Sequence, residues 1–245
     1  MHSPHNFTKA RACFESALAL DPGNVDALVG VGRVDSEMVG GGLTDDRVAR
    51  LSSAEAALNK ALLLAPNHPW AHTWMGLTYI HTRRGQQAIA EAERALALDR
   101  NLAHARGGVL ATANIAIGRA EQVEGHVKEA IRLSPRDKDL YIWTMLAGMA
   151  NLCLADDDAA VTWLRRSVEA NRNLPMTLFW LAAALANLGK QEDATAAVDA
   201  ALALDPSVTV GRLRGVLTGM SDNPTFQAQI PHVLEGLRKA GFPEG

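Results

Sequence analysis

Apolar residues recur at helical spacing between Leu174 and Pro206, and this pattern predicts two helices joined by a tight turn. The first helix is expected from about Pro175 to Leu188, with a stripe formed by Leu178, Leu181 and Leu185. Gly189 ends it, because glycine readily adopts the left-handed conformation in which helices commonly finish. The second helix is expected from about Gln191 to Leu204. Two helices of this length cannot bury their apolar faces alone, so the pair needs neighbouring pairs.

The pattern that closes this pair, Ala-apolar-x-Leu-x-Pro, recurs along the chain. It ends at Pro22, Pro66, Pro135 and Pro206, and weaker copies end at Arg100 and Arg172. The successive intervals between these six positions are 44, 34, 35, 37 and 34 residues. A helix-turn-helix period of 34 residues is typical of the tetratricopeptide repeat.

In this register the chain resembles the tetratricopeptide repeat family over roughly residues 7–206. The small residue inside each first helix is Gly32, Gly76, Ala111, Gly148 or Ala182. The alanine that opens each second helix is Ala10, Ala54, Ala88, Ala160 or Ala194, and Val123 departs from this rule. The glycine between helices is present as Gly118 and Gly189 and is displaced to Gly85. The resemblance implies an all-α, right-handed superhelical solenoid of about five to six repeats over residues 1–206.

The N-terminal repeat departs from this pattern, because residues 1–6 lead straight into a second helix with no first helix before it. Either the chain is a fragment of something longer, or this helix pairs with another molecule. Its apolar residues would then be an interface for self-association, formed by Phe7, Phe14 and Leu18. The 44-residue interval predicts an insertion near residues 39–50, with a mobile loop over residues 39–44 and a Thr44-Asp45-Asp46 cap that opens a long helix to Leu64.

After Pro206 the period is lost, and residues 207–245 are expected to form helices that cap the last repeat. One helix is predicted over Ser207–Gly219, with Ser207 as its N-cap. A last helix follows an Asp222–Pro224 cap, and Pro231 is expected to kink it.

Composition favours a helical protein that binds neither nucleic acid nor membranes. The 245 residues are 48% hydrophobic and 21% charged, and the net charge of −3 provides no general field that would attract polyanions. No apolar run is long enough to span a bilayer and no signal-peptide pattern opens the chain, so a cytoplasmic location is expected. Cys13 and Cys153 fall in apolar helices of different repeats, which favours reduced, buried thiols.

Several strings also resemble one bacterial group of tetratricopeptide proteins, in which the repeats follow a class III adenylate or guanylate cyclase domain or a winged-helix regulator domain. These strings are TDDR from Thr44, ERALALDRN from Glu93, WLRRSVEANRNLP from Trp163, SDNP from Ser221 and EGLRKAGFPEG from Glu235. The resemblance implies a regulatory or assembly module of a bacterial signalling protein. It implies no cyclase activity, because no strand-rich segment is present to carry the catalytic residues.

Residues that could suggest catalysis or metal binding have simpler explanations. His68 and His72 are four residues apart, but Pro69 stands where a zinc-protease motif needs Glu, so a helix cap and an outer-face imidazole are expected. Asp156, Asp157 and Asp158 lack the spacing of a calcium loop and suit the positive end of a helix. We expect no catalytic residues, cofactor or metal, and therefore no enzyme.

The remaining candidate site is the inner wall that first helices form in such a solenoid. Its predicted partner-binding residues are Trp70, Leu77, Ile80, Ile142, Met145, Met149, Met176 and Phe179. An apolar, Met-rich wall suits a helix or extended segment of another protein. Two interpretations stay open at this point: the wall binds a partner, or it is covered by the C-terminal helices or by another domain. The predicted function is a protein-interaction scaffold, with a self-associating structural module as the alternative and a detached, inactive part of a cyclase as the third.

Overall fold

The computed structural model describes residues 4–245, which contain thirteen α-helices and no strand. The chain divides into two compact units, residues 1–105 and 106–245, and each is described here by itself. No helix in the described part is both long enough and apolar enough to cross a membrane.

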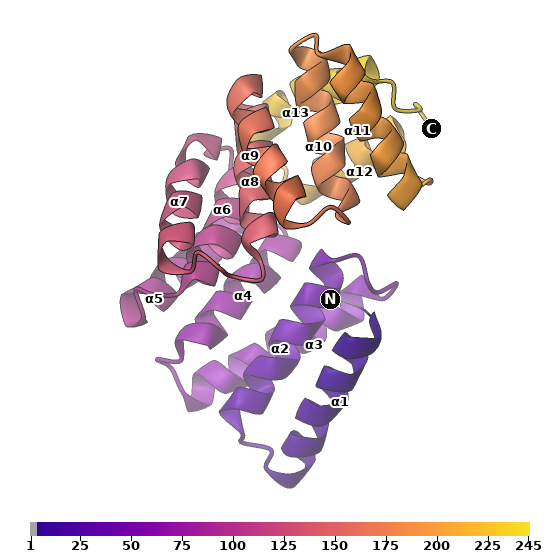
Figure 1. The fold of residues 1–245 in the computed structure, drawn as a ribbon. Helices are drawn as coiled ribbons and strands as arrows, with labels where there is room; N and C mark the ends of the chain where they lie inside the picture. The colour runs from indigo at the N-terminus through magenta and orange to yellow at the C-terminus, as the bar shows by residue number, and fades with distance from the viewer. Residues whose placement is uncertain (1–3) are drawn as a thin grey trace. The chain divides into compact units, whose positions relative to one another are not determined.

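The first unit contains five helices (Figure 1), which are α1 Pro4–Leu20, α2 Val25–Gly40, α3 Arg47–Leu64, α4 Pro69–His81 and α5 Gly85–Leu98. Helix α2 lies between α1 and α4, and it also packs on α3. The long α3 follows the Asp46 N-cap, as its sequence predicts, because the Asp46 carboxylate accepts a hydrogen bond from the Ala49 amide. Helix α1 is a second helix of a repeat, and no helix precedes it among the residues that are described.

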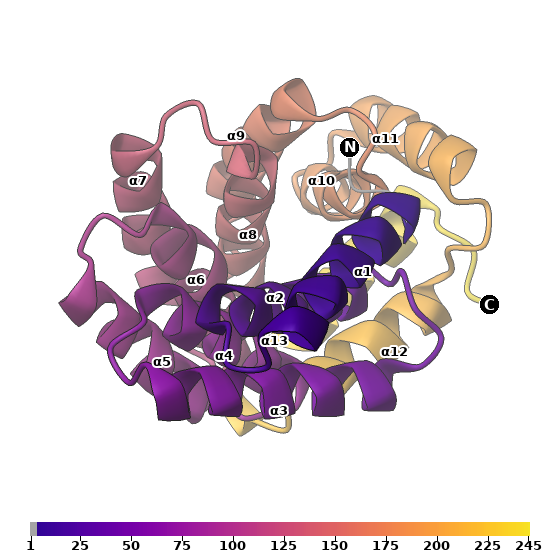
Figure 2. The same ribbon diagram turned by 90° about the horizontal axis from the view of Figure 1, so that it is seen from below.

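The second unit begins within a π-helical turn, η1 Ala105–Leu110. Its further elements are α6 Ala111–Ala116, the 3₁₀ turn η2 Ala120–Gln122, α7 Val123–Leu133, α8 Leu140–Cys153, α9 Asp157–Ala170, α10 Pro175–Asn187, α11 Gln191–Leu204, α12 Val210–Met220 and α13 Pro224–Ala240. Helix α8 packs on α9 (Figure 2). Helix α10 contacts both α11 and α13.

Paired helices approach closely at the small residue of the first helix. A Cβ atom on Gly32 would lie 2.4 Å from Leu58 Cγ, and one on Gly148 would lie 2.4 Å from Leu164 Cγ. The same contact therefore recurs in both units, where a larger side chain would force the helices apart. This close approach explains why glycine recurs in the repeat pattern.

Four helix-to-helix turns share one backbone geometry, with a left-handed residue at Arg83, Gly118, Ala155 and Gly189. In each turn the left-handed residue donates its amide to the carbonyl three residues earlier, and the next residue donates to the carbonyl five residues before it. The expectation that Gly85 supplies this conformation is wrong. Arg83 takes it, with φ of 59°, and Gly85 is the first residue of α5.

The C-terminal segment packs on the last repeat. Helix α12 begins at Val210 after a Thr209 cap, not after Ser207, because the Ser207 hydroxyl bonds to Asp205 instead. Helix α13 is capped by Asn223 as predicted and continues through Pro231 without interruption. The chain after α13 returns to α12, where the Val210 amide donates to the Pro243 carbonyl at 2.8 Å. These contacts hold the tail against the start of α12.

Candidate interaction surface

In the first unit, α2 and α4 are held in register by polar contacts. Ser36 Oγ and Thr78 Oγ1 lie 2.8 Å apart in the buried part of the interface. At the N-terminal ends of the two helices, His68 Nε2 lies 3.3 Å from a carboxylate oxygen of Asp26. His68 is also the N-cap of α4, because its Nδ1 accepts a hydrogen bond from the Ala71 amide, and Pro69 occupies the first helical position.

An aromatic cluster lies on this pair of helices. The rings of Trp70 and Trp74 are stacked with centroids 6.0 Å apart, and His104 lies 4.7 Å from Trp74. The Arg33 guanidinium of α2 sits over the Trp74 ring at 5.0 Å, a distance at which a cation is attracted to an aromatic face. Trp74 is buried, whereas Trp70 is 40% exposed. The cluster thus presents one rigidly supported indole to the surroundings.

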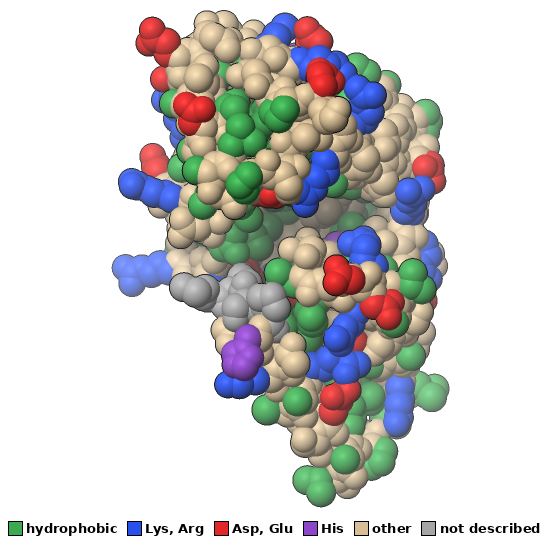
Figure 3. Space-filling view, turned by 90° about the vertical axis from the view of Figure 1, so that its right-hand side faces the viewer, with side chains coloured by type: hydrophobic (Ala, Val, Ile, Leu, Met, Phe, Trp, Pro, Cys, Tyr) green, Lys and Arg blue, Asp and Glu red, His purple; other side chains and the backbone are tan. Residues whose placement is uncertain are grey.

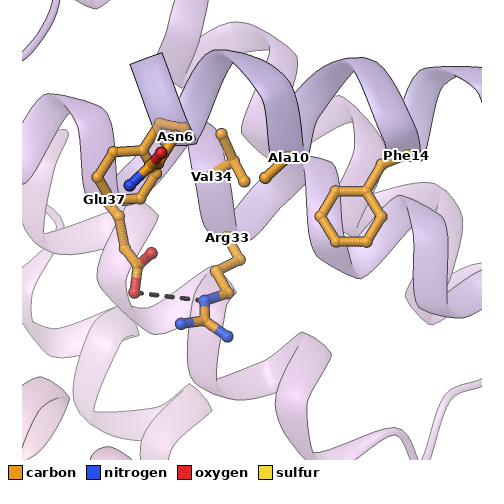
Figure 4. A pocket seen from close by; sticks show the side chains of 7 residues that line it. Asn6, Ala10, Phe14, Arg33, Val34 and Glu37 are labelled. Atoms are coloured by element: carbon orange, nitrogen blue, oxygen red, sulfur yellow. Dashed lines mark hydrogen bonds and ion pairs between the residues drawn. The ribbon is translucent and has the colours of Figure 1, made fainter. Parts of the chain in front are cut away.

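A pocket of about 300 Å³ opens between α1 and α2 next to this cluster. It is lined by Asn6, Phe7, Ala10, Phe14, Arg33, Val34 and Glu37. Figure 4 shows the Phe14 ring along one side and the Arg33 side chain reaching toward Glu37. Arg33 Nε lies 3.3 Å from the Glu37 carboxylate, so the polar rim of the pocket carries one charge of each sign.

Of the predicted partner-binding residues in the first unit, Trp70 is the exposed one, at 40%. Leu77 is half-buried against the core formed by Leu28, Leu58 and Trp74, and Ile80 is buried. Sequence periodicity identified the face of α4 on which these residues lie. It did not show how deeply the neighbouring helix covers each of them.

The predicted residues in the second unit are less accessible. Met149 and Phe179 are buried, and Ile142, Met145 and Met176 are half-buried. Helix α13 packs on both α8 and α10. The Phe242 ring meets the Phe179 ring edge-on, with centroids 5.6 Å apart. At Phe179 the wall is therefore covered by the chain's own C-terminal segment.

The residues proposed for self-association also contact their own unit. Phe7 is buried with Val34 and Met38 of α2, so the expectation that it is exposed is wrong. Leu18 packs partly against the core beneath α2, and Phe14 is half-buried. Leu20 is the exposed apolar residue at the end of α1. The face of α1 that remains accessible is therefore narrower than its sequence suggests.

A buried acidic residue escaped the sequence analysis. Asp35 of α2 is fully buried, and its carboxylate accepts hydrogen bonds from Arg11 Nε and Arg50 Nη1, each at 2.9 Å. Arg11 also donates to Ser53 Oγ at 3.2 Å. This network joins α1, α2 and α3. The spacing of single charges along a chain does not indicate such a network, because its members come from three helices.

Burial determines the surroundings of two histidines and of one of the two cysteines. His72 is buried and not on an outer face as predicted, because its ring contacts Glu91 at 2.5 Å and the Pro66 carbonyl at 2.9 Å. Burial, with a smaller effect from the Arg47 charge, lowers the pKa of His81 to about 4. Burial raises the pKa of Cys153 to about 12, which keeps it a thiol. Cys13 is exposed, in contrast to the expectation of a buried thiol.

The acidic run that resembles a calcium loop caps α9. Asp156 is the N-cap and accepts a hydrogen bond from the Ala159 amide at 3.1 Å. Asp157 lies 3.1 Å from His232 of α13 and 3.2 Å from Asn187 of α10. Within residues 4–245 no three His, Cys, Asp or Glu residues are grouped so that they could hold a metal ion.

Comparisons with known proteins establish the fold. No family model and no curated protein matches the chain. Among solved structures, PilF of Pseudomonas aeruginosa is 18% identical with a TM-score of 0.61, over 86% of this chain and 95% of that one. YrrB, described as a TPR protein with an unusual peptide-binding site, is 17% identical with a TM-score of 0.51, over 79% and 93% of the two chains. A human IFIT1 dimer with PPP-AAAA is 19% identical with a TM-score of 0.69, over 95% and 55%. The all-α fold of this chain is therefore of the tetratricopeptide repeat type.

Proposed function

We propose that the protein is a non-catalytic interaction scaffold, and that it binds a segment of another protein on the inner face of its first unit. The observation that carries this proposal is the exposed Trp70 indole, which is stacked on Trp74 beside the Arg33 guanidinium. Trp and Arg are the residues that most often dominate binding energy at interfaces, and a pre-organised ring loses little entropy when it binds. The peptide-binding site named for YrrB supports the proposal by analogy of fold.

The wall of the second unit is the weaker part of the predicted groove. The Phe179 and Phe242 rings already pack against each other, so a partner would have to displace the chain's own tail to reach this face. The interpretation in which the groove is covered intramolecularly is therefore favoured there. A role as a regulatory or assembly module of bacterial signalling is the part of the proposal that rests on sequence resemblance. A cytoplasmic location is also part of the proposal, and it rests on the sequence pattern.

Binding of nucleic acid is a less favoured alternative. The IFIT1 structure contains PPP-AAAA, so a protein with a similar fold can bind a ligand that is not a peptide. In this chain Arg33 is paired with Glu37, and Figure 3 shows acidic and basic side chains interspersed over one face of the molecule. A nucleic-acid site usually gathers positive charge on one surface, so a polypeptide partner suits this surface better.

A displayed peptide library tests the proposal. Peptides selected on the full chain should bind the Trp70→Glu variant at least ten times more weakly, because the charge removes the aromatic contact. Leu98→Glu is the matched control, since Leu98 of α5 is equally exposed, and it should bind as the parent does. Circular dichroism checks that both variants keep their helix content. A library that yields no binder, or binders indifferent to Trp70, would contradict the proposal.

A further inference from the structure

Helix α13 lies on the first helices of the second unit. It packs mainly on α10, it also contacts α8, and it contacts α11 least. A helix that continued the stack of repeats would instead pack on the preceding second helix, as α10 packs on α9 and α4 packs on α3. Helix α13 therefore covers α8 and α10, the helices that carry the predicted partner-binding residues of this unit.

The contact side of α13 has the spacing of an amphipathic helix that binds as a ligand. Its buried apolar residues recur every three or four positions and are Phe226, Ile230, Val233, Leu234 and Leu237. The backbone also comes close to α10, because a Cβ atom on Gly236 would lie 2.7 Å from the Ala183 carbonyl oxygen. Apolar anchors at intervals of one helical turn are the means by which amphipathic helices bind other proteins.

A partly exposed polar cluster attaches α13 to α9 and α10. His232 Nε2 lies 3.1 Å from the Asp157 carboxylate and 3.0 Å from Asn187 Nδ2, and Asn187 Nδ2 lies 3.2 Å from Asp157 Oδ1. One ring nitrogen cannot both donate to the carboxylate and accept from the amide, so at most two of the three contacts are hydrogen bonds. The cluster thus stabilises the closed arrangement less than three hydrogen bonds would.

Helix α13 depends on this contact for its own helical structure. Pro231 has no amide hydrogen, so it cannot give the Gln227 carbonyl the hydrogen bond that any other residue at this position would donate. Gly236 adds backbone flexibility in the next turn. Pro231 is exposed, so its side chain adds nothing to the buried face. An isolated helix with these two residues is unstable, and α13 is therefore helical because it is bound.

We propose that residues 224–245, which are α13 and the tail after it, form an autoinhibitory strap that occupies α8 and α10 until an amphipathic helix of a partner protein replaces it. The partner helix would carry apolar residues at the spacing of α13. It would carry glycine at the position of Gly236, where any Cβ atom meets the Ala183 carbonyl. The strap belongs to the second unit and Trp70 to the first, so this proposal and the proposed function can fail independently.

Hydrogen exchange of the parent chain distinguishes a strap from a permanent cap. The amides of Val233, Leu234 and Leu237 should exchange roughly tenfold faster than the buried amides of α10, because α13 opens while the repeats stay folded. Pro231→Ala should slow exchange in α13 by roughly tenfold, since it restores a helix hydrogen bond without touching the buried face. Exchange of α13 and α10 at one common rate would overturn the proposal.

A fluorescent peptide of residues 221–245 tests whether the covered face binds a helix in trans. It should bind the full chain with Gly236→Val saturably, and it should bind the parent roughly tenfold more weakly, because the intact strap competes. Gly215→Val is the matched control, since a Cβ atom on Gly215 of α12 has nothing within 4 Å, and this variant should bind as weakly as the parent does. A peptide that itself carries Gly236→Val should lose roughly tenfold in affinity for the opened chain.

Circular dichroism establishes that each variant is folded, and Trp70→Glu should leave binding of this peptide unchanged. Absence of saturable binding to a folded Gly236→Val chain, or equal binding to that chain and the parent, would overturn the proposal. Sedimentation that shows a dimer of the parent and a monomer of Gly236→Val would also overturn it, because the strap would then bind a second copy of the chain.

Discussion

Single residues at the turns carry a measurable conformational cost. Gly118 and Gly189 adopt the left-handed conformation without penalty, whereas Ala155 adopts the same conformation with φ of 60°. The left-handed region crowds Cβ against the following carbonyl, at a cost of roughly 1 kcal/mol for an ordinary residue. The hydrogen bonds of the turn hold Ala155 there nevertheless, since its amide donates to the Leu152 carbonyl at 3.1 Å.

We therefore predict that Ala155→Gly stabilises the protein by about 0.5 kcal/mol. The strain energy that is removed from the folded state is larger than the extra conformational entropy that glycine gives to the unfolded chain. Gly189→Ala is the control, because it makes the reverse substitution at the equivalent position of another turn, and it should destabilise the protein by about 1 kcal/mol. Denaturant unfolding followed by circular dichroism measures both changes. Two changes of the same sign would show that the turn conformation does not set the effect.

At the scale of elements, the C-terminal helices cover apolar surface that a repeat would otherwise expose. Helix α13 approaches α10 closely at Gly236, where a Cβ atom would lie 2.7 Å from the Ala183 carbonyl oxygen. Phe242, just beyond α13, is buried against Phe179. The tail therefore acts as a packed element of the second unit.

Phe242→Ala should lower the free energy of unfolding by about 3 kcal/mol, since it removes a buried ring and leaves a cavity. Val216 of α12 is exposed, and Val216→Ala should change stability by less than about 0.5 kcal/mol. Differential scanning calorimetry and urea unfolding compare the two variants. A small effect at Phe242 would mean that the tail does not stabilise α10.

At the scale of the whole molecule, stability in a helical repeat protein is local, because each repeat contacts mainly its neighbours. The Asp35 network belongs entirely to the first unit, where it joins three helices. Both arginines are partly exposed, which moderates the cost of leaving them unpaired.

Asp35→Asn should cost about 2 kcal/mol, because it removes the charge that neutralises Arg11 and Arg50. Hydrogen exchange should become faster in α1, α2 and α3 and stay unchanged in α8 to α11. Asp193→Asn, which breaks the exposed pair with Arg165, should have almost no effect, about 0.5 kcal/mol at most. Acceleration spread evenly over both units would contradict local stability.

The sequence alone determined the helical-repeat architecture, the long α3 and the small contact residues. These features follow from local periodicity and from residue types whose backbone preferences are short-range. Only the tertiary structure decided which apolar residues remain accessible. Phe179 and Trp70 follow the same pattern in sequence, but Phe179 is buried against Phe242 whereas Trp70 is 40% exposed. Burial depends on segments far apart in the chain, as does the pairing of Asp35 with Arg11 and Arg50, and no local pattern contains that information.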